Sequence, residues 1–175
     1  DDSAYKTSGG LHGVGSSVVN ALSTYMDVKI SRDGAVHHDR YERGIPVVEL
    51  EDGLLPVIGK TKKTGTCVNF LPDPTIFEKT RFKEEEIKSR LHETAYLNPE
   101  LTIIFTDKRK TQEERIEYHE PDGIIGFIKD LNSKKEVIHD PVYYKGEAEG
   151  IEVEVAFQYV NEFHENVLGF CNNIY

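Results

Sequence analysis

The sequence predicts an α+β fold, and three observations lead to this class. Residues 26–31 alternate between apolar and polar side chains, as a half-buried strand does. Asp33–Gly34 follows directly and is a strong hairpin signal, because a type I′ turn needs positive φ at both central residues. Apolar residues at helical spacing mark two other segments, residues 14–24 and 83–97. Strands joined by a hairpin, together with separate helices, indicate α+β.

The remaining elements follow in chain order. The strand 26–31 returns over residues 35–43, and a further strand over residues 66–71 stops at Pro72. In the helix 83–97, Ile87, Leu91 and Thr94/Ala95 form the inner face. Residues 101–107 and 115–119 are expected to form a strand pair. Asp122 is expected to cap a helix with an inner face of Ile124, Phe127, Ile128 and Leu131.

The predicted secondary structure changes around residues 134–141, from mixed helices and strands to strands alone. From there only strands are expected, over residues 142–145, 150–159 and 167–172. In the second of these, Ile151, Val153, Val155, Phe157 and Tyr159 should share one face. We therefore predict one domain over residues 1–133 and the beginning of a second over residues 134–175.

Composition limits the possible functions. The 175 residues carry a net charge of −10, which argues against a dedicated nucleic-acid surface within them. No apolar run approaches the roughly 20 residues that span a bilayer, and the N-terminal residues do not resemble a secretory signal. Cys67 and Cys171 are expected to be buried free thiols in a reducing cytoplasm, with one disulfide as the alternative.

The strongest local signal is the segment Ser8–Gly15, with the sequence SGGLHGVG. Four glycines leading directly into a helix favour a loop whose backbone amides converge on an anion such as phosphate, and His12 is a candidate extra donor. The alternative is a tight turn that packs a helix closely on a sheet. The spacing is the reverse of the dinucleotide fingerprint, and Gly59–Lys60–Thr61 lacks a correctly placed glycine for a P-loop. His37–His38–Asp39 is interpreted as a solvated hairpin rather than a metal site.

Two segments carry a more specific signal. Residues 5–23, YKTSGGLHGVGSSVVNALS, closely resemble the ATP-lid and phosphate-binding segment of the family that comprises DNA gyrase B and its sister, topoisomerase IV B. Residues 63–73, KTGTCVNFLPD, resemble the family's K-T-G-T-x-V-x-F-x-P-D strand, and residues 150–159 and 165–175 resemble the opening of its transducer domain. The resemblance implies a partial ATPase sandwich of the GHKL type, with helices on a mixed sheet, followed by the first strands of a ribosomal-S5-like transducer.

The resemblance also implies roles for individual residues. Those expected to wrap the triphosphate are Gly9, Gly10, Leu11, His12, Gly13, Val14 and Gly15, with Ser17 supporting the loop. Tyr5 would reach the adenine side and Lys6 the phosphates. Thr66 would reach the adenine pocket, with Gly65 giving room and Val68 lining it. Relatives often carry a small apolar residue where this chain has Ser16. This difference would affect the packing against the nucleotide and not the phosphate loop.

Other functional residues of the family are expected outside these 175 residues. The general-base Glu, the Asn that holds Mg²⁺ and the Asp that reads adenine would precede residue 1, and a Gln and a Lys that touch the γ-phosphate would follow Tyr175. No catalytic residue and no metal ligand is therefore assigned here. A general base must lie within hydrogen-bond reach of the attacking water, so this chain alone is expected not to hydrolyse ATP and to bind it poorly.

The function that the resemblance implies is that of the ATP-binding subunit of a bacterial type II topoisomerase, in the first place gyrase, which couples ATP binding and hydrolysis to DNA strand passage and supercoiling. It implies ATP and Mg²⁺ as cofactors and a cytoplasmic location. The implied partners are a second copy of the same protein, gyrase A and DNA, the last two through other regions, with no membrane. Two alternatives stay open: topoisomerase IV B, or a non-catalytic interaction module of the same fold. Another enzyme or chaperone of the fold superfamily fits the strands after residue 141 less well.

Overall fold

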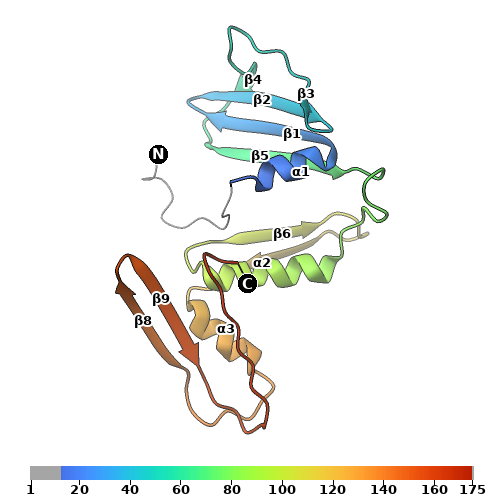
Figure 1. Cartoon of the computed structure of the whole chain (residues 1–175). Coiled ribbons are helices and arrows are strands. Elements are labelled where there is room, and N and C mark those ends of the chain that lie inside the picture. Colours follow the sequence, from blue (N-terminus) through green and yellow to red (C-terminus); the bar gives the residue numbers. More distant parts are fainter. Residues whose placement is uncertain (1–12, 175) are drawn as a thin grey trace. The chain divides into compact units, whose positions relative to one another are not determined.

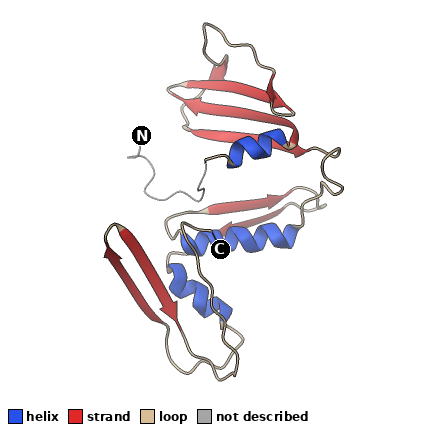
Figure 2. Cartoon of the chain, viewed as in Figure 1, coloured by secondary structure: helices blue, strands red, loops and turns tan. Residues whose placement is uncertain are grey.

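The computed structural model describes residues 13–174, and the chain divides between Arg81 and Phe82 into two compact units (Figure 1). Each unit combines helices with antiparallel strands (Figure 2), so the predicted α+β class is confirmed. The domain boundary predicted near residue 133 stays a prediction. Among the residues described, no helix has the length and apolar character needed to cross a membrane.

The first unit is a sheet with one short helix. Helix α1 (Gly15–Ala21) leads into β1 (Ser23–Arg32), and the other strands are β2 (Ala35–Glu42), β3 (Ile45–Pro46), β4 (Val57–Lys60) and β5 (Gly65–Pro72). The sheet order is β3-β2-β1-β5, with β4 also paired to β2. All pairs are antiparallel. The strands expected over residues 26–31, 35–43 and 66–71 are confirmed, and the first is longer than predicted.

The β1–β2 hairpin confirms the predicted turn. Asp33 and Gly34 have φ of 52° and 84°, as a type I′ turn requires, and Arg32 pairs with Ala35 across it. The helix predicted over residues 14–24 is shorter, because the chain enters β1 at Ser23, where pairing with Pro72 of β5 begins. The Ser23 hydroxyl donates to the Val19 carbonyl at 2.6 Å at this junction.

The second unit contains α2 (Glu84–Leu97), a hairpin of β6 (Ile103–Asp107) and β7 (Glu114–Tyr118), α3 (Gly123–Leu131), and a hairpin of β8 (Val142–Ala148) and β9 (Ile151–Phe157). Its buried core includes Ala95, Tyr96 and Tyr118. The Tyr96 ring stacks on Phe127 of α3, with centroids 5.0 Å apart. The predicted helices and strand pairs of this unit are therefore confirmed up to residue 157.

Charged side chains join α2 to the β6–β7 hairpin. Lys88 and Lys110 both contact Glu84 and Glu114, with Lys88 Nζ 2.7 Å from Glu114 Oε1 and Lys110 Nζ 2.7 Å from Glu84 Oε1. The neighbouring lysines, Lys110 foremost, lower the pKa of Glu114 to about 2. This network fixes the start of α2 to the hairpin on which the helix packs.

Several expectations were wrong, most of them about this unit. Residues 167–172 form no strand, because no partner strand lies beside them among residues 13–174, and only an isolated bridge joins Cys171 to Ile174. Asp122 precedes α3, but its side chain forms no capping hydrogen bond, and Leu131 is 40% exposed. Cys67 and Cys171 are both free, as expected, but exposed rather than buried, because described residues cover neither segment.

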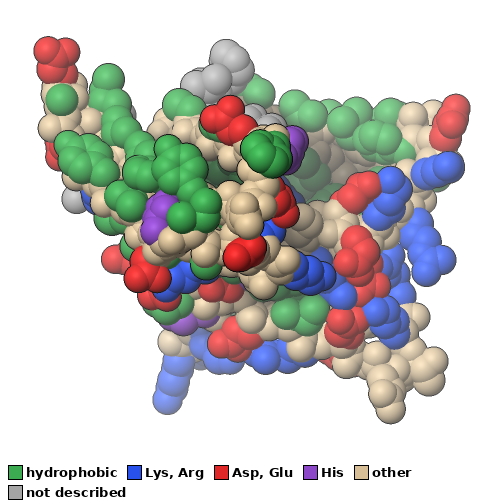
Figure 3. Space-filling model, turned by 90° about the horizontal axis from the view of Figure 1, so that it is seen from below, with side chains coloured by type: hydrophobic (Ala, Val, Ile, Leu, Met, Phe, Trp, Pro, Cys, Tyr) green, Lys and Arg blue, Asp and Glu red, His purple; other side chains and the backbone are tan. Residues whose placement is uncertain are grey.

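The β8–β9 hairpin shows the alternation that the sequence predicted. Glu154 lies within 3.5 Å of Lys145 and accepts a hydrogen bond from the Tyr143 hydroxyl at 2.7 Å. The large apolar residues of β9 are all exposed: Ile151, Val153, Val155 and Phe157. Hydrophobic side chains accordingly gather at the left of Figure 3, where the hairpin lies. The apolar face is present but remains open.

Candidate functional site

The predicted site residues fall into three groups. Tyr5, Lys6, Gly9, Gly10, Leu11 and His12 lie outside the described residues. Gly13, Val14, Gly15 and Ser17 lie at the start of α1, and Gly65, Thr66 and Val68 lie on β5. The last two groups belong to the first unit, in which α1 lies along the sheet and begins on the side where β5 begins (Figure 1).

The backbone at the start of α1 is open. Gly13 has a φ of +64°, a left-handed conformation that glycine adopts without strain. Val14 precedes the helix in the position of the N-cap, and no side chain caps the helix. The carbonyl of Val14 accepts the first helical hydrogen bond, from Val18 at 2.9 Å. Among the described residues, no acceptor binds the N–H groups of Gly13 or Val14.

Space is also available around these glycines. A Cβ atom placed on Gly13, Gly15 or Gly65 would meet no other atom of the described residues within 4 Å. Close packing therefore does not explain the choice of glycine at these positions. The anion-binding loop and the tight turn both stay predictions here, because residues 8–12 of the segment lie outside the described residues.

The β5 residues lie on an exposed strand. Thr66 pairs with Ile30 and Val68 with Val28 on β1. Residues two apart on a strand point to the same face, so Thr66 and Val68 share a face, and Val68 is 52% exposed. Gly65 has a φ of +154° at the beginning of the strand. The strand thus presents a small polar side chain and an apolar side chain on the same face.

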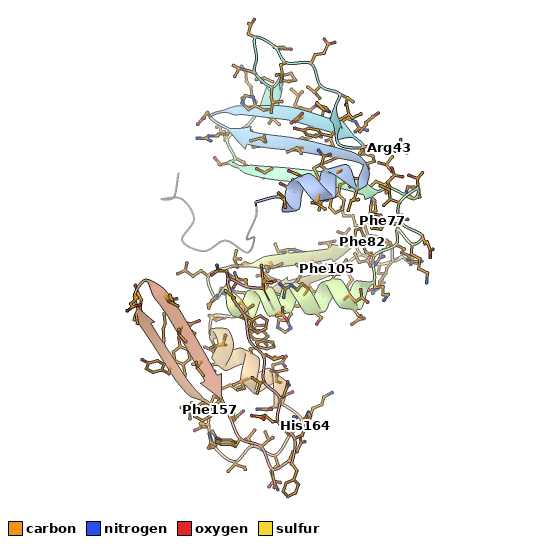
Figure 4. All side chains as sticks on the ribbon, in the orientation of Figure 1. Arg43, Phe77, Phe82, Phe105, Phe157 and His164 are labelled. Carbon is orange, nitrogen blue, oxygen red and sulfur yellow. The ribbon has the colours of Figure 1, made fainter. Side chains whose placement is uncertain are left out.

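A buried carboxylate, Asp73, links the end of β5 to neighbouring segments of the first unit. The sequence analysis did not assign this role to it. Asp73 is 1% exposed and follows β5 directly. It accepts hydrogen bonds from the Thr75 amide at 2.9 Å, from the Thr75 hydroxyl at 2.7 Å and from Arg43 Nε at 2.7 Å. Arg43 is labelled in Figure 4. These donors, the Thr75 amide foremost, hold the pKa of Asp73 below its usual value.

Asp73 also connects the strand to the helix. Its own amide donates to the carbonyl of Leu22, just after α1, at 3.0 Å. Arg43 comes from the turn after β2, so Asp73 joins three parts of the first unit through its carboxylate and its amide. In the sequence, the only sign of this role of Asp73 is that it closes the segment 63–73 after Pro72. Its partner Arg43 lies 30 residues away, and no local pattern identifies Arg43 as the partner.

Another pair of polar side chains lies on the sheet of the first unit. His38 Nε2 lies 2.7 Å from Asp27 Oδ2 across the β1–β2 pair, and His38 holds the pKa of Asp27 below its usual value. Among residues 13–174 no group of His, Cys, Asp and Glu side chains is arranged to hold a metal ion. A hollow along α2 contains none of the predicted residues and is lined by Glu85, Glu86, Ser89, Arg90 and Glu93.

Comparisons with known proteins relate these elements to one group of enzymes. The family model for DNA gyrase B matches residues 123–175. The chain is 49% identical to the DNA gyrase B protein of Streptococcus pneumoniae over 173 residues, which cover 98% of this chain and 26% of that protein. It is also 49% identical to the DNA topoisomerase 4 B protein of the same organism over 172 residues, 97% of this chain and 26% of that protein. The chain thus spans about a quarter of the length of the curated relatives it matches.

Solved structures give the same result. The 43K ATPase domain of Thermus thermophilus gyrase B, in complex with an aminocoumarin, matches with a TM-score of 0.73 and 36% identity over 85% of this chain and 40% of that one. The B-subunit of the DNA gyrase from Myxococcus xanthus matches with a TM-score of 0.76 and 27% identity over 87% of this chain and 44% of that one. The resemblance to the gyrase B family is confirmed along nearly the whole chain.

Proposed function

We propose that this chain is part of the ATP-binding subunit of a bacterial type II topoisomerase, in which it binds the phosphates and one side of the adenine of ATP. The observation that carries the proposal is the open start of α1. There, Gly13 and Val14 offer N–H groups without a described acceptor, in a chain 49% identical to a DNA gyrase B protein. Gyrase is the first candidate and topoisomerase IV the alternative, and the chain is 49% identical to the S. pneumoniae relative of each kind.

The phosphate-binding part would be the loop from Gly9 to Gly15. The N–H groups of Gly13, Val14 and Gly15 would donate to phosphate oxygens, with Gly9, Gly10, Leu11 and His12 completing the loop. Each hydrogen bond to a charged group contributes about 1.5–3 kcal/mol. The helix dipole adds only about 0.3–1 kcal/mol per charge. Several converging amides, rather than the dipole, would therefore supply most of the affinity for phosphate.

The base-binding part would be β5. Thr66 would hydrogen-bond toward the adenine, and Val68 would cover part of its apolar face. Gly65 would leave room for the base, since a Cβ there meets open space. From the part of the chain that is not described, Tyr5 would reach the adenine side and Lys6 the phosphates. Asp73 would act indirectly, by keeping the end of β5 fixed to Leu22 behind α1.

ATP, bound with Mg²⁺, would supply the γ-phosphoryl group that is transferred to water. The chain's own contribution would be to bind and orient the ATP. The amides near Gly13 would also stabilise the charge that develops on the phosphate oxygens. No described carboxylate is assigned as the general base, and none is assigned to the metal. We accordingly propose that the residues here bind nucleotide while a carboxylate outside them activates water. A cytoplasmic location, pairing of two copies of the protein, and contacts with gyrase A and DNA through other regions belong to the same proposal.

The test compares residues 1–175 alone with a chimera in which they replace the matched segment of S. pneumoniae DNA gyrase B. Calorimetric titration with a non-hydrolysable ATP analogue measures binding, and phosphate release measures hydrolysis. We expect weak or no binding by the isolated chain, and both binding and hydrolysis by the chimera. A chimera that unfolds cooperatively but neither binds nor hydrolyses ATP contradicts the proposal and favours a non-catalytic interaction module.

A further inference from the structure

A group of cations lies at one end of the sheet in the first unit. Lys60 ends β4, Lys62 and Lys63 follow in the loop to β5, and Arg32 ends β1. The strand register brings these segments together, because Ala35 pairs with both Arg32 and Lys60, and Ser31 pairs with Gly65. We call Arg32, Lys60, Lys62 and Lys63 the basic rim.

The loop that carries the lysines is attached to the β1–β2 hairpin. The Thr61 amide donates to the Gly34 carbonyl at 3.0 Å, and the Lys63 amide donates to the Thr61 hydroxyl at 3.0 Å. The backbone of the rim is therefore held in place, while its side chains extend into solvent. All four cations are exposed.

The positive charge of the rim is largely uncompensated. No ion pair joins Lys60, Lys62 or Lys63 to any residue in the described part of the chain, although many other cations of the chain are paired. Arg32 lies 3.3 Å from Asp33, but both side chains are at least 76% exposed, and such surface pairs are weak. The rim therefore presents most of its positive charge to solvent.

The rim stands out against the charge of the rest of the chain. Residues 13–81 carry nine Lys and Arg and nine Asp and Glu, whereas residues 82–175 carry 11 Lys and Arg and 20 Asp and Glu. A chain with a net charge of −10 repels a polyanion at long range. A local group of cations beside a binding site can offset this repulsion and focus the field on the site.

The rim adjoins the proposed nucleotide site. Lys63 stands two residues before Gly65, and Thr66 follows on the same strand. We propose that the basic rim attracts the phosphates of a nucleoside triphosphate and speeds its arrival at the site formed by β5 and the start of α1, an inference that rests on the proposed function. Lysine suits this role, because its ammonium group is a hydrated point charge on a flexible stem.

The test is made on the full-length protein with the triple variant K60Q/K62Q/K63Q. The matched control is K108Q/K129Q/K134Q, which removes the same charge from exposed lysines of the second unit that form no ion pair among residues 13–174. Stopped-flow measurements with a fluorescent ATP analogue give the association and dissociation rates at several salt concentrations. We expect the rim variant to associate roughly tenfold more slowly at about 0.02 M ionic strength, with the difference disappearing above about 0.5 M, and dissociation to change little.

The control variant should associate with the nucleotide at nearly the unsubstituted rate. Equal association by the rim and control variants overturns the inference but leaves the proposed function intact. Absence of saturable nucleotide binding by the unsubstituted protein contradicts the proposed function and the inference together. A labelled DNA duplex serves as a further probe. If the rim variant loses affinity for DNA while its nucleotide association is unchanged, the rim serves nucleic acid and the inference is wrong.

Discussion

Replacement of Gly13 by valine in the full-length protein should separate ligand binding from folding. Gly13 has a φ of +64°, and a Cβ there meets no described atom within 4 Å, so the cost of valine comes mainly from its strained backbone conformation. The left-handed conformation costs an ordinary residue roughly 1–2 kcal/mol. In a unit of this size, each kcal/mol of destabilisation lowers the Tm by about 4–8 °C. The first unit should therefore remain folded.

The effect on nucleotide binding should be much larger. A valine side chain would project into the space that the phosphates need and displace at least two charged hydrogen bonds. At about 1.5–3 kcal/mol each, their loss weakens binding at least 100-fold, because every 1.4 kcal/mol is a factor of ten. Calorimetric titration with a non-hydrolysable ATP analogue measures this change.

Gly34→Val is the matched control. Gly34 has a φ of +84° and equally open surroundings, but it lies in the β1–β2 hairpin and outside the proposed site. It should lose comparable or greater stability while its nucleotide affinity stays within about threefold of the unsubstituted value, which is less than 1 kcal/mol. If Gly13→Val binds nucleotide as well as the unsubstituted protein does, Gly13 does not line the phosphate site and the reasoning fails.

Three further predictions concern the framework of the two units. Tyr96→Ala should destabilise the second unit by about 3–5 kcal/mol, the usual cost of deleting a buried aromatic side chain, as measured by denaturant unfolding; a loss below 1 kcal/mol would contradict its place in the core. Arg43→Ala should lower the Tm of the first unit, since it leaves the buried Asp73 carboxylate without its cationic partner; Arg32→Ala, at an exposed pair, is the control and should change Tm little. Because the folded-state pKa of Glu114 is lowered to about 2, its ion pairs should stabilise fully above about pH 4.5, near the ordinary glutamate value. That stability should disappear as the pH falls toward 2, and Glu114→Gln should flatten the dependence of Tm on pH in this range.

The parts of the fold that were predicted depend on local chemistry. Asp33–Gly34 fixes its own hairpin, because the turn type requires residues that tolerate positive φ. The spacing of Ile87 and Leu91 predicts a helix, since one face of α2 must be apolar to pack on its neighbours. The glycine loop predicts an anion site from composition alone, and that site stays a prediction; Gly13 and Gly15 are its glycines within the described residues.

The parts that were missed depend on distant residues. The Arg43–Asp73 pair joins segments 30 residues apart, so neither residue shows its role locally. Residues 167–172 have the alternation of a strand, but a strand also needs a paired neighbour, which the pattern does not supply. The exposure of Cys67 has a similar origin, because a strand's alternation shows which residues share a face and not whether another layer covers that face.

One measurement tests the central claim most directly. The full-length protein is labelled with ¹⁵N-glycine, and its amide spectrum is followed as a non-hydrolysable ATP analogue is added. The account predicts that the amide signals of Gly13 and Gly15 shift most, that the Gly65 signal shifts as well, and that those of Gly34 and Gly53 stay in place. Saturable binding that leaves the Gly13 and Gly15 signals unchanged would show that the nucleotide binds elsewhere and would contradict the account.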